Sequence, residues 1–571
     1  MDKKRLILNT LLFLPTTLFA HALSITATVP FPAEVPVTSS ATATFTITNI
    51  SKANITAIDK SRFPGGSGIT TIATTCGNVL KPTQSCTIQL NIQPPSTPQT
   101  LSSALQIWAK PTVDGVQYPF TINVTAGLPS ITLQAIPVNS QLPPLRDPVV
   151  AQNNGNWLIV SGTTGNFHQF DNTYFIPNIY VYNPATTQLY SMSISSTNLP
   201  LAVKEQLSSS NVEFLEDGDT LYIIGGFYTP NNTTWSTLHT ITAINIPGMI
   251  NAIITNNTNL ASFVSYSTAI SQFQVTGGQL GKIGNNFYLT FGQNCFGDNY
   301  CSGGQTYTNS IYEFTANATL SNLSIINTVT HADNDNSGWR RRDYTLIPFM
   351  LGGTETLLAE GGPFTQPTNP QPGNVWTNAI DFNGNLQANG NFLNQQANQY
   401  FAPSLSMYSA ASSMSYAATF SGLSNLYWST TGLVEDNTTP YGNILDLISY
   451  NNANGNIQEY ANTQPLCSGQ PLASCLYMGL TAIFIPISNP TYFDGRHVLQ
   501  LDQLPANTQT LVGYVYAGLL SPNREVFSST PPPNGPSYTT NTIYAVYVTP
   551  SGTGSVTWNN ITNLYPGIPN G

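Results

Sequence analysis

The sequence predicts an all-β protein made of two parts, a β-sandwich followed by a β-propeller of six blades. The first observation is a repeat: six times, an apolar β-rich run is followed by a loop rich in Gly, Asn and aromatic residues and then by a second β-rich run. The second is that the region before residue 127 lacks this repeat and has shorter runs of alternating polarity. The third is composition. Charged residues make up only 7% of the chain, against about 25% in ordinary globular domains, which suits a secreted β-protein with many turns.

The repeat that predicts the propeller extends over residues 148–571. The first runs of the six copies lie at residues 156–162, 219–226, 286–292, 355–362, 425–432 and 509–518, and their partner runs lie at 178–183, 239–245, 309–314, 378–382, 443–447 and 541–548. One such sheet cannot bury both faces, so we expect the sheets to stack in a ring. Extra strands within residues 477–518 would give seven blades, which is the alternative count.

Two motifs within the repeat resemble a known family. TLYIIGG at residues 220–226 and NIYVYNPATTQ at residues 178–188 look like the second and third strands of Kelch-type, galactose-oxidase-like propeller blades. The resemblance implies the fold over most of the chain. It does not imply one function, because such propellers include binding modules and enzymes.

Residues 1–22 are typical of a secretory signal peptide. Lys3, Lys4 and Arg5 precede an apolar stretch, and Ala20-His21-Ala22 fits a cleavage site of the A-x-A type. The stretch is too short and too interrupted by Pro to predict a transmembrane helix. We therefore predict a secreted mature chain that begins at Leu23.

Residues 23–127 predict a separate β-sandwich. Its expected strands lie at residues 25–29, 43–49, 55–59, 69–74, 87–92, 104–109 and 120–124. The run CGNVLKPTQSCTIQLNIQP at residues 76–94 resembles bacterial Ig-like modules of the choice-of-anchor D and ASH type, which implies a spacer or adhesion role. Residues 128–147 are expected to be a linker, or to contribute a strand at 130–136 that closes the ring.

The six cysteines fall into three close pairs, which predicts three local disulfides in an exported chain. The pairs are Cys76 with Cys86, Cys295 with Cys301, and Cys467 with Cys475. None has the spacing of a C-x-x-C metal or redox motif.

The formal net charge is −10, with only 16 Lys and Arg in 571 residues. Nucleic-acid affinity depends on clustered basic residues, and attraction to an anionic membrane depends on basic charge. The composition therefore argues against both kinds of partner.

The long loops that follow the first runs contain many aromatic residues. Tyr174, Trp235 and Trp376 lie among Asn and Gln residues there. Aromatic faces stack on sugars while amides hydrogen-bond to them, so these residues predict a glycan-binding or peptide-binding surface. The alternative is that the rings pack the loops onto the scaffold.

A possible calcium loop begins at residue 333. Asp333, Asp335 and Ser337 stand at alternating positions before Gly338, as in the start of a D-x-D-x-S-G loop. Tyr344 stands where the bidentate Glu of such a loop belongs. The alternative is an Asn/Asp turn that binds no metal.

Three adjacent arginines follow this loop. We expect Arg340 and Arg342 to begin a strand, to point to the same side and to bind a carboxylate or sulfate at the channel mouth. Arg341, on the opposite side, is expected to be structural. The alternative for the pair is ion pairing with a neighbouring blade.

No motif for a nucleophile elbow, a zinc protease or a P-loop is present. We therefore predict a secreted or surface-exposed binding protein that recognises a glycan or a host or cell-surface protein, with Ca²⁺ as its one candidate cofactor. The alternative is a glycan-active hydrolase or lyase with its site at the channel mouth. The enzyme requires titratable groups with shifted pKa values to meet in one pocket.

Overall fold

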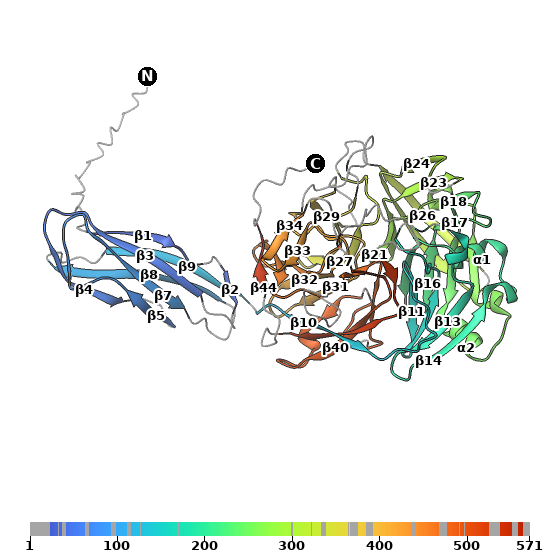
Figure 1. Ribbon diagram of the computed structural model, residues 1–571, viewed down its shortest axis with the longest axis horizontal. Coiled ribbons are helices and arrows are strands. Elements are labelled where there is room, and N and C mark those ends of the chain that lie inside the picture. Colours follow the sequence, from blue (N-terminus) through green and yellow to red (C-terminus); the bar gives the residue numbers. More distant parts are fainter. Residues whose placement is uncertain are drawn as a thin grey trace, which may run out of the picture. The chain divides into compact units, whose positions relative to one another are not determined.

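The computed structural model describes residues 23–562 apart from some internal segments. The gaps are residues 32–33, 37–40, 63–67, 93–98, 111–115, 126, 168, 170, 299–300, 321, 333–337, 364, 366–374, 384–391, 437–440, 467–476, 490, 496, 523, 525–536 and 551–557. The chain divides into two compact units, Met1–Leu128 and Pro129–Gly571 (Figure 1). Both are built almost entirely of β-strands, as predicted.

The first unit consists of two sheets. One has the order β1 (Leu23–Val29), β3 (Ala41–Asn49), β7 (Ser85–Ile92) and β5 (Ile69–Thr74). The other has the order β2 (Glu34–Pro36), β9 (Val116–Thr125), β8 (Gln99–Lys110), β4 (Ile55–Arg62) and β6 (Val79–Leu80). All seven strands expected from the sequence are present, together with the short strands β2 and β6.

The two sheets of this unit share one hydrophobic core. Phe45 and Ile88 come from the first sheet, whereas Leu105 and Ile122 come from the second, and all four are buried in one cluster. Strand β7 alternates between buried and more exposed residues along its length, as expected where one face of a sheet covers a core. The Cys76–Cys86 disulfide forms as predicted.

The second unit contains six antiparallel four-stranded sheets, called sheets one to six. Sheet one is β11 (Val149–Asn153), β12 (Asn156–Val160), β13 (Asn178–Asn183) and β14 (Gln188–Ser193); sheet two is β15 (Glu213–Asp217), β16 (Thr220–Ile224), β19 (Ile241–Asn245) and β20 (Val264–Ser267); sheet three is β21 (Gln279–Ile283), β22 (Asn286–Thr290), β25 (Ser310–Ala318) and β26 (Leu323–Ala332). Sheet four is β27 (Thr345–Leu351), β28 (Thr354–Glu360), β29 (Asn378–Phe382) and β30 (Leu393–Asn394); sheet five is β31 (Ser404–Ser409), β32 (Met414–Phe420), β35 (Leu445–Asn451) and β36 (Ile457–Asn462); sheet six is β38 (Ile483–Pro486), β40 (Thr510–Tyr516), β43 (Ile543–Thr549) and β10 (Ser130–Ile136). Sheet five is extended by β39 (Leu499–Gln500) and β44 (Trp558–Asn560).

Tight turns join the first two strands of sheets one to four. Between β11 and β12, Asn154 and Gly155 have φ values of +50° and +77°, which is the Asn-Gly combination that two-residue hairpins favour.

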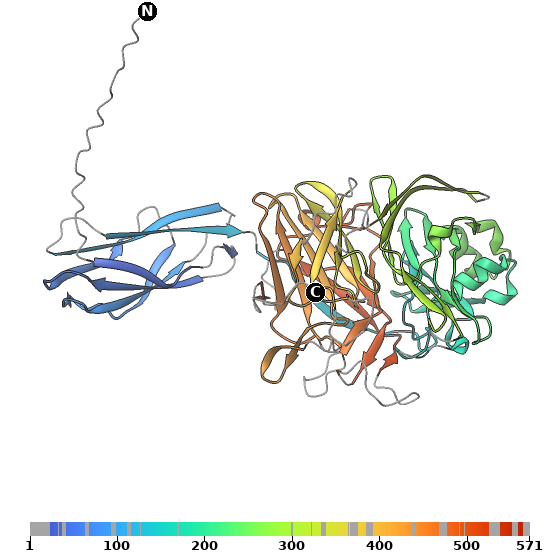
Figure 2. The ribbon, with the colours of Figure 1, turned by 90° about the horizontal axis from the view of Figure 1, so that it is seen from above.

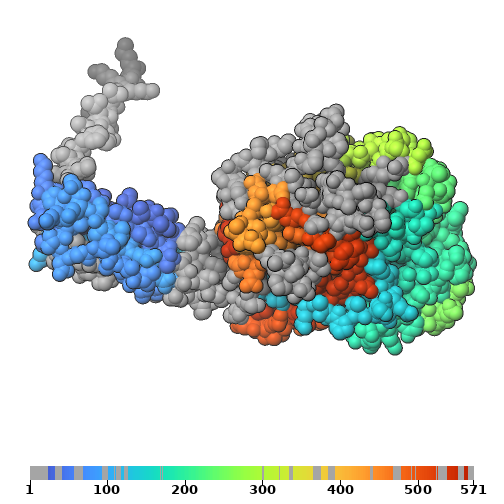
Figure 3. All heavy atoms as spheres, viewed as in Figure 1, coloured from blue at the N-terminus to red at the C-terminus, as the bar shows by residue number. Residues whose placement is uncertain are grey.

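Sheets from the start and the end of this unit lie side by side. Strand β10 pairs with β43 along its length, with Ile131 opposite Val548. Trp157 of sheet one lies 5.9 Å from Tyr516 of sheet six, measured between ring centroids, within a shared cluster of buried residues. In Figure 3 the cyan surface from the start of the unit adjoins the red surface from its end. The segment at 130–136 is therefore a strand of sheet six.

Small sheets and two helices complete the unit. Loops of sheets two and three join in the sheet β17 (Phe227–Tyr228), β18 (Trp235–Thr237), β23 (Gln293–Gly297) and β24 (Gly304–Tyr307), which contains the predicted Cys295–Cys301 disulfide. Further small sheets are β33 (Leu426–Ser429) with β34 (Gly432–Glu435), and β37 (Tyr477–Leu480) with β41 (Leu519–Ser521) and β42 (Tyr538–Thr539). Helices α1 (Leu201–Leu207) and α2 (Ile246–Ile254) lie at the teal side of Figure 2, where α2 contacts every strand of sheet one. Among the described residues no helix is long and apolar enough to cross a membrane.

One expected strand was wrong. The apolar run at residues 425–432 forms the hairpin of β33 and β34 instead of the second strand of sheet five. That place belongs to β32, which is buried along its whole length. Its sequence, MSYAATF, lacks the run of large aliphatic residues seen in the other copies, so its pattern does not predict a strand.

Candidate functional site

A residue two or three positions before the first strand of each sheet adopts a left-handed backbone conformation. The six residues are Asp147, Asn211, Gly277, Asp343, Phe401 and Thr481, with φ values between +50° and +68°. Such φ values are rare outside Gly, and for bulky residues they signal a conformation imposed by the surrounding structure. The recurrence therefore marks one equivalent position in all six sheets.

Backbone hydrogen bonds link these positions from one sheet to the next. The N–H of Gly277 donates to Asn211 O at 3.4 Å, and the N–H of Asp343 donates to Gly277 O at 2.8 Å. The N–H of Thr481 donates to Phe401 O at 2.7 Å, and the N–H of Asp147 donates to Thr481 O at 3.2 Å. The last bond connects sheet one to sheet six. The side chains at these positions are thereby brought together although they are far apart in sequence.

Two carboxyl groups occupy this set of positions. With its amide group oriented to donate, Asn211 Nδ2 lies 2.9 Å from Asp147 Oδ2. Asp343 lies over Gly277: a Cβ atom at residue 277 would be 2.7 Å from Asp343 Oδ1. The Gly at 277 therefore leaves the space that the Asp343 carboxyl group occupies.

An arginine precedes each of these carboxyl groups in the chain. Arg146 Nε lies 3.8 Å from Asp147 Oδ2, and Arg342 Nε lies 3.5 Å from Asp343 Oδ2. Both Asp side chains are 11% exposed. Each carboxyl group is thus largely buried and has one guanidinium close enough to offset part of its charge.

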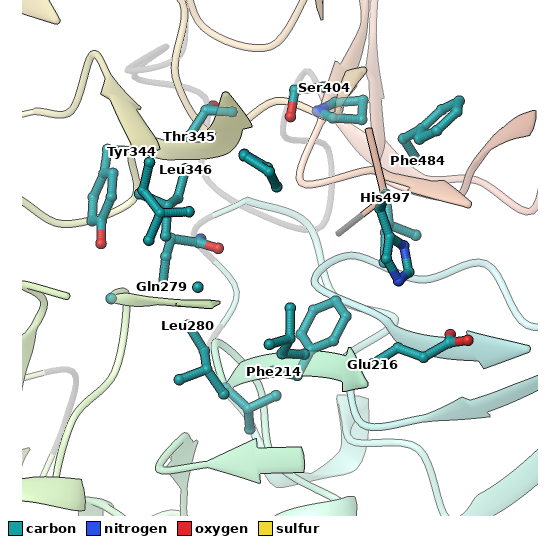
Figure 4. A pocket seen from close by; sticks show the side chains of 18 of the residues that line it. Phe214, Glu216, Gln279, Leu280, Tyr344, Thr345, Leu346, Ser404, Phe484 and His497 are labelled. Atoms are coloured by element: carbon teal, nitrogen blue, oxygen red, sulfur yellow. The ribbon is translucent and has the colours of Figure 1, made fainter. Parts of the chain in front are cut away.

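A cavity of about 340 Å³ lies next to these carboxyl groups, among the first strands of sheets two to four and the strand starts of sheets five and six (Figure 4). Asp147, Asn211, Gly277 and Asp343 line it, together with an apolar wall that includes Phe214, Leu346 and Phe484. In Figure 4, Tyr344 and Gln279 lie on one side of this space and His497 lies on the other. The cavity combines apolar surface with a few polar groups, as small-molecule sites do.

Titratable residues also lie at the far side of the cavity, where strand β15 ends. Glu216 accepts a hydrogen bond from Gln152 N at 3.0 Å, and Lys282 Nζ lies 2.6 Å from Asp217 Oδ2. Burial lowers the pKa of His497, while Asp494 and Asp217 act in the opposite direction. The acidic residues in the cavity outnumber the basic ones.

Asp147 and Asp343 are called the mouth carboxyl groups below. Burial raises the pKa of both. The pKa of Asp147 rises to about 7, because desolvation outweighs the effect of Arg146 and because Asp343 adds repulsion. The pKa of Asp343 rises to about 6, with Arg342 opposing the desolvation. The pKa of Glu216 also rises to about 7, because burial desolvates its carboxyl group. Near neutral pH the two mouth groups can therefore hold a proton or release it, which general acids and bases require.

Arg146 also orders a loop above its own Asp. Its Nε donates to Thr163 Oγ1 at 2.9 Å, its Nη1 donates to Asn166 O at 2.6 Å and to Phe167 O, and its Nη2 donates to Gln169 O at 3.1 Å. The guanidinium is consequently held by the protein itself.

The three arginines predicted from the sequence precede strand β27, which begins at Thr345, so the expectation that they begin a strand was wrong. The left-handed turn at Asp343 separates them from the strand. Arg340 stacks on the ring of Tyr307 at 3.8 Å from its centroid, and Arg342 is 8% exposed. Among the described residues, the cavity lining includes Asp343 but neither Arg340 nor Arg342. Anion binding by this pair stays a prediction.

Arg341 is fully buried, as expected for a structural residue. It donates to Gly338 O at 2.6 Å, to Gly361 O at 2.7 Å, and to both oxygens of Asn378 at 2.7 and 2.9 Å. Its pKa falls to about 9 because burial disfavours the charged form.

The predicted aromatic residues have packing roles. Trp235 is 3% exposed and stacks on Phe227 at 5.0 Å. Trp376 is 8% exposed and donates from Nε1 to Arg340 O at 2.9 Å. Tyr174 is half-buried and packs against Gly165. These contacts support the alternative that the rings hold the loops, and ligand binding by them stays a prediction.

Two predicted sites lie outside the described residues. Asp333, Asp335 and Ser337 fall in one gap, and Cys467 and Cys475 fall in another. The calcium loop and the third disulfide therefore stay predictions.

The mouth carboxyl groups were missed from the sequence. A usable signal was present, because Arg146-Asp147 and Arg342-Asp343 are the same dipeptide at the start of sheets one and four. Basic residues are rare in this chain, so the arginines of these dipeptides are more conspicuous than the Asp residues that follow them.

The fold and the cavity define an all-β protein of two units with its candidate site at the strand starts of six sheets. No protein-family model matches the chain, and no curated protein matches it. Among solved structures, it is similar to the structure of YjhT at 10% identity, over 63% of this chain and 94% of that chain, with a TM-score of 0.32. It is also similar to the structure of the Vibrio cholerae VesB protease at 12% identity, over 18% of this chain and 31% of that one, with a TM-score of 0.13. Likeness this weak carries no argument, so function is argued from the residues.

Proposed function

We propose that the second unit is a six-bladed β-propeller of Kelch-like type, that the first unit is an Ig-like β-sandwich, and that the exported protein binds a glycan. The propeller is supported by the six sheets, by the core that sheets one and six share, and by the pairing of β10 with β43. The sandwich is supported by two sheets around one core. The first unit then serves as a spacer or adhesion module.

The cavity beside Asp147 and Asp343 is the proposed ligand site. The observation that carries this assignment is the cavity itself: about 340 Å³, apolar on one wall and lined by two opposed carboxyl groups and an amide. Binding sites for small molecules range from about 300 to 1,000 Å³, so one sugar residue would fit. Carboxyl groups accept hydrogen bonds from sugar hydroxyls, and the apolar wall covers the C–H face of the ring.

The ligand is neutral rather than acidic in this proposal. Arg146 is held by protein acceptors and Arg342 lies beside Asp343, and the described cavity lining contains carboxyl groups but neither arginine. An acidic sugar would place like charges together without a partner, which is costly in a buried site. The natural source of the ligand would be a glycan or a glycoprotein of a cell surface.

Catalysis on a glycan is the second candidate. The observation that favours it is the pair of pKa values, about 7 for Asp147 and about 6 for Asp343. Glycoside hydrolases use one carboxyl group as an acid and another as a base or nucleophile. Two titratable groups with shifted pKa values in one cavity are what such an enzyme requires.

A glycan-array screen on the mature chain tests the first proposal, with turnover of every hit measured by product analysis. Asp147→Asn and Asp343→Asn should each weaken binding of a neutral glycan. Asp219→Asn, an exposed carboxylate outside the cavity, is the matched control and should bind as the wild type does. If both cavity variants bind the glycan as the wild type does, the binding site lies elsewhere in the protein. Turnover that both variants abolish would favour the enzyme.

A further inference from the structure

A cluster of buried polar side chains, called the chamber below, lies between sheets four and five. Glu360 at the end of β28 faces β32, because its Oε2 accepts a hydrogen bond from Thr419 Oγ1 at 3.0 Å. Thr419 is directly opposite Asp446 in the ladder between β32 and β35, so their side chains share one face of sheet five. Glu459 of β36 lies on the same face, two residues from Ala461, the partner of Asp446. Three carboxyl groups thus meet between the two sheets.

The three carboxyl groups are shut off from solvent. Glu360 and Glu459 are 0% exposed, and Asp446 is 1% exposed. Within the described part of the chain, none of them forms an ion pair with Lys, Arg or His. Burial raises the pKa of Glu360 and of Asp446, and repulsion adds to it: Glu459 acts on Glu360, and Glu459 and Glu360 act on Asp446. A buried negative charge without a partner is strongly unfavourable.

The loop that connects β30 to β31 brings amide groups to the same chamber. Gln396 N and Ala397 N donate to the two oxygens of Glu459, at 2.7 and 2.8 Å. Gln395 is held at the Glu360 end, because its Oε1 accepts from Gly361 N at 3.0 Å. Gln399 is held two residues from Asp446, because its Nε2 donates to Ile444 O at 3.0 Å.

Several polar atoms of this chamber have no hydrogen-bond partner. They are Glu360 Oε1, Asp446 Oδ1, Gln399 Oε1 and Gln395 Nε2. All of these residues are at most 1% exposed. Buried polar groups in native proteins nearly always have partners, so something must occupy the chamber.

We propose that this chamber holds a calcium ion. Three of the unpartnered atoms are oxygens, two from carboxyl groups and one from the Gln399 amide. Such oxygens are the ligands that Ca²⁺ prefers, with water completing six to eight positions. The charges also agree. Glu459 is already satisfied by two N–H groups, whereas Glu360 and Asp446 each keep a free oxygen, so these two groups, once deprotonated, would balance the charge of a divalent cation.

Carboxyl groups alone do not form the site. Over the residues described, no three side chains of His, Cys, Asp or Glu are placed to hold a metal ion together. The amide oxygens of the connecting loop are therefore required. This explains why a run of amide residues, NQQANQ at residues 394–399, is buried at the junction of two sheets. The site is distinct from the loop at Asp333 and Asp335.

Metal analysis and thermal unfolding test the proposal. The mature protein is unfolded in guanidinium chloride with EDTA and refolded in metal-free buffer, with either EDTA or CaCl₂ added. We expect calcium to be retained in stoichiometric amount after dialysis and to raise the Tm by several degrees over the EDTA sample. Mg²⁺ at the same concentration should raise it less, because it demands a regular octahedral site.

Variants assign the ion to the chamber. Glu360→Gln and Asp446→Asn should each lose the calcium-dependent rise in Tm and the bound calcium. Glu213→Gln is the matched control, since Glu213 is 1% exposed and has one unpartnered oxygen, but it lies in sheet two; it should keep both. Asp333→Ala should also keep both.

Three outcomes would overturn the proposal. One is a refolded wild type without calcium and with equal Tm in EDTA and in CaCl₂, in which case water and protons fill the chamber. Another is loss of calcium in Asp333→Ala with retention in Glu360→Gln, which would assign the ion to the loop. The third is loss of the effect in Glu213→Gln. The wild-type metal analysis decides the matter even if the chamber variants do not fold.

Discussion

The acidic groups at the cavity mouth and those in the chamber between sheets four and five are both buried, yet they differ in their neighbours. Asp147 and Asp343 each have an arginine within 4 Å and line an open cavity. Among the described residues, the neighbours of Glu360, Asp446 and Glu459 are hydrogen-bond donors and one another. A buried carboxyl group beside an arginine has part of its charge offset by the protein, whereas one without a cationic neighbour needs a proton or a bound cation.

The pH dependence of stability should separate the two regions most clearly. A carboxyl group whose pKa is raised by folding gives stability that is complete below its unfolded pKa, 3.8 for Asp or 4.5 for Glu, and that is lost as the pH rises through its folded pKa. In EDTA, the free energy of unfolding should therefore fall from about pH 4.5 to pH 8, at up to about 1.4 kcal/mol per pH unit for each group. Asp343 should titrate near pH 6, and Glu360 near pH 8.

Urea unfolding from pH 4.5 to pH 8.5 measures this dependence. Asp343→Asn should flatten the curve only up to about pH 6, whereas Glu360→Gln should flatten it up to about pH 8. Calcium should flatten the upper part alone if it binds in the chamber. A stability that rises with pH across this range would contradict the upward shifts in both regions.

Arg341→Ala should cause the next largest loss. Arg341 lies between the two regions, since Gly361, which accepts from it, follows Glu360 in the chain. Its removal leaves four buried acceptor atoms without a donor. We therefore expect a loss of about 3–5 kcal/mol in the free energy of unfolding, as for other broken buried charge networks. Arg340→Ala is the control and should cost about 1 kcal/mol, the worth of a cation–π contact. Equal losses in the two variants would show that burial does not distinguish them.

Asp147→Asn and Asp343→Asn should change ligand binding more than stability. A hydrogen bond to a charged group contributes about 1.5–3 kcal/mol, so affinity for a neutral glycan should fall by roughly 10-fold to 100-fold. Isothermal titration calorimetry measures the fall, with Glu360→Gln as the variant from the other region. A similar fall in Glu360→Gln would mean that the loss reflects a general change of the unit.

Gly277→Ala should have the smallest effect on stability and a specific effect on the mouth. Its φ of +68° disfavours Ala, and the added Cβ would lie 2.7 Å from Asp343 Oδ1, so we expect a loss of about 1 kcal/mol together with weaker ligand binding. Gly218→Ala, at φ +58° with open space around it and outside the cavity lining, is the control for backbone strain. If both variants bind equally well, Asp343 is not positioned by the space at Gly277.

The strands of this protein could be predicted from the sequence because they depend on local patterns. Alternating runs located all seven main strands of the first unit, and the apolar runs ending in Gly located most of the central strands of the second. The failure at residues 425–432 has a physical cause. Strand β32 is buried on both faces and built largely from small residues, so its pattern carries neither the alternation nor the bulk that marks a strand.

Neither candidate site could be predicted, because each is made by residues from different sheets. Asp147 and Asp343 belong to repeats one and four, and only the packing of strand starts from different sheets brings them to one cavity. Glu360, Asp446 and the amides of residues 394–399 meet only because sheets four and five pack face to face. Local sequence patterns were sufficient for most strand positions and for the disulfides Cys76–Cys86 and Cys295–Cys301. Tertiary structure decided which charges share a buried space, since desolvation and Coulomb interactions depend on distance in space rather than along the chain.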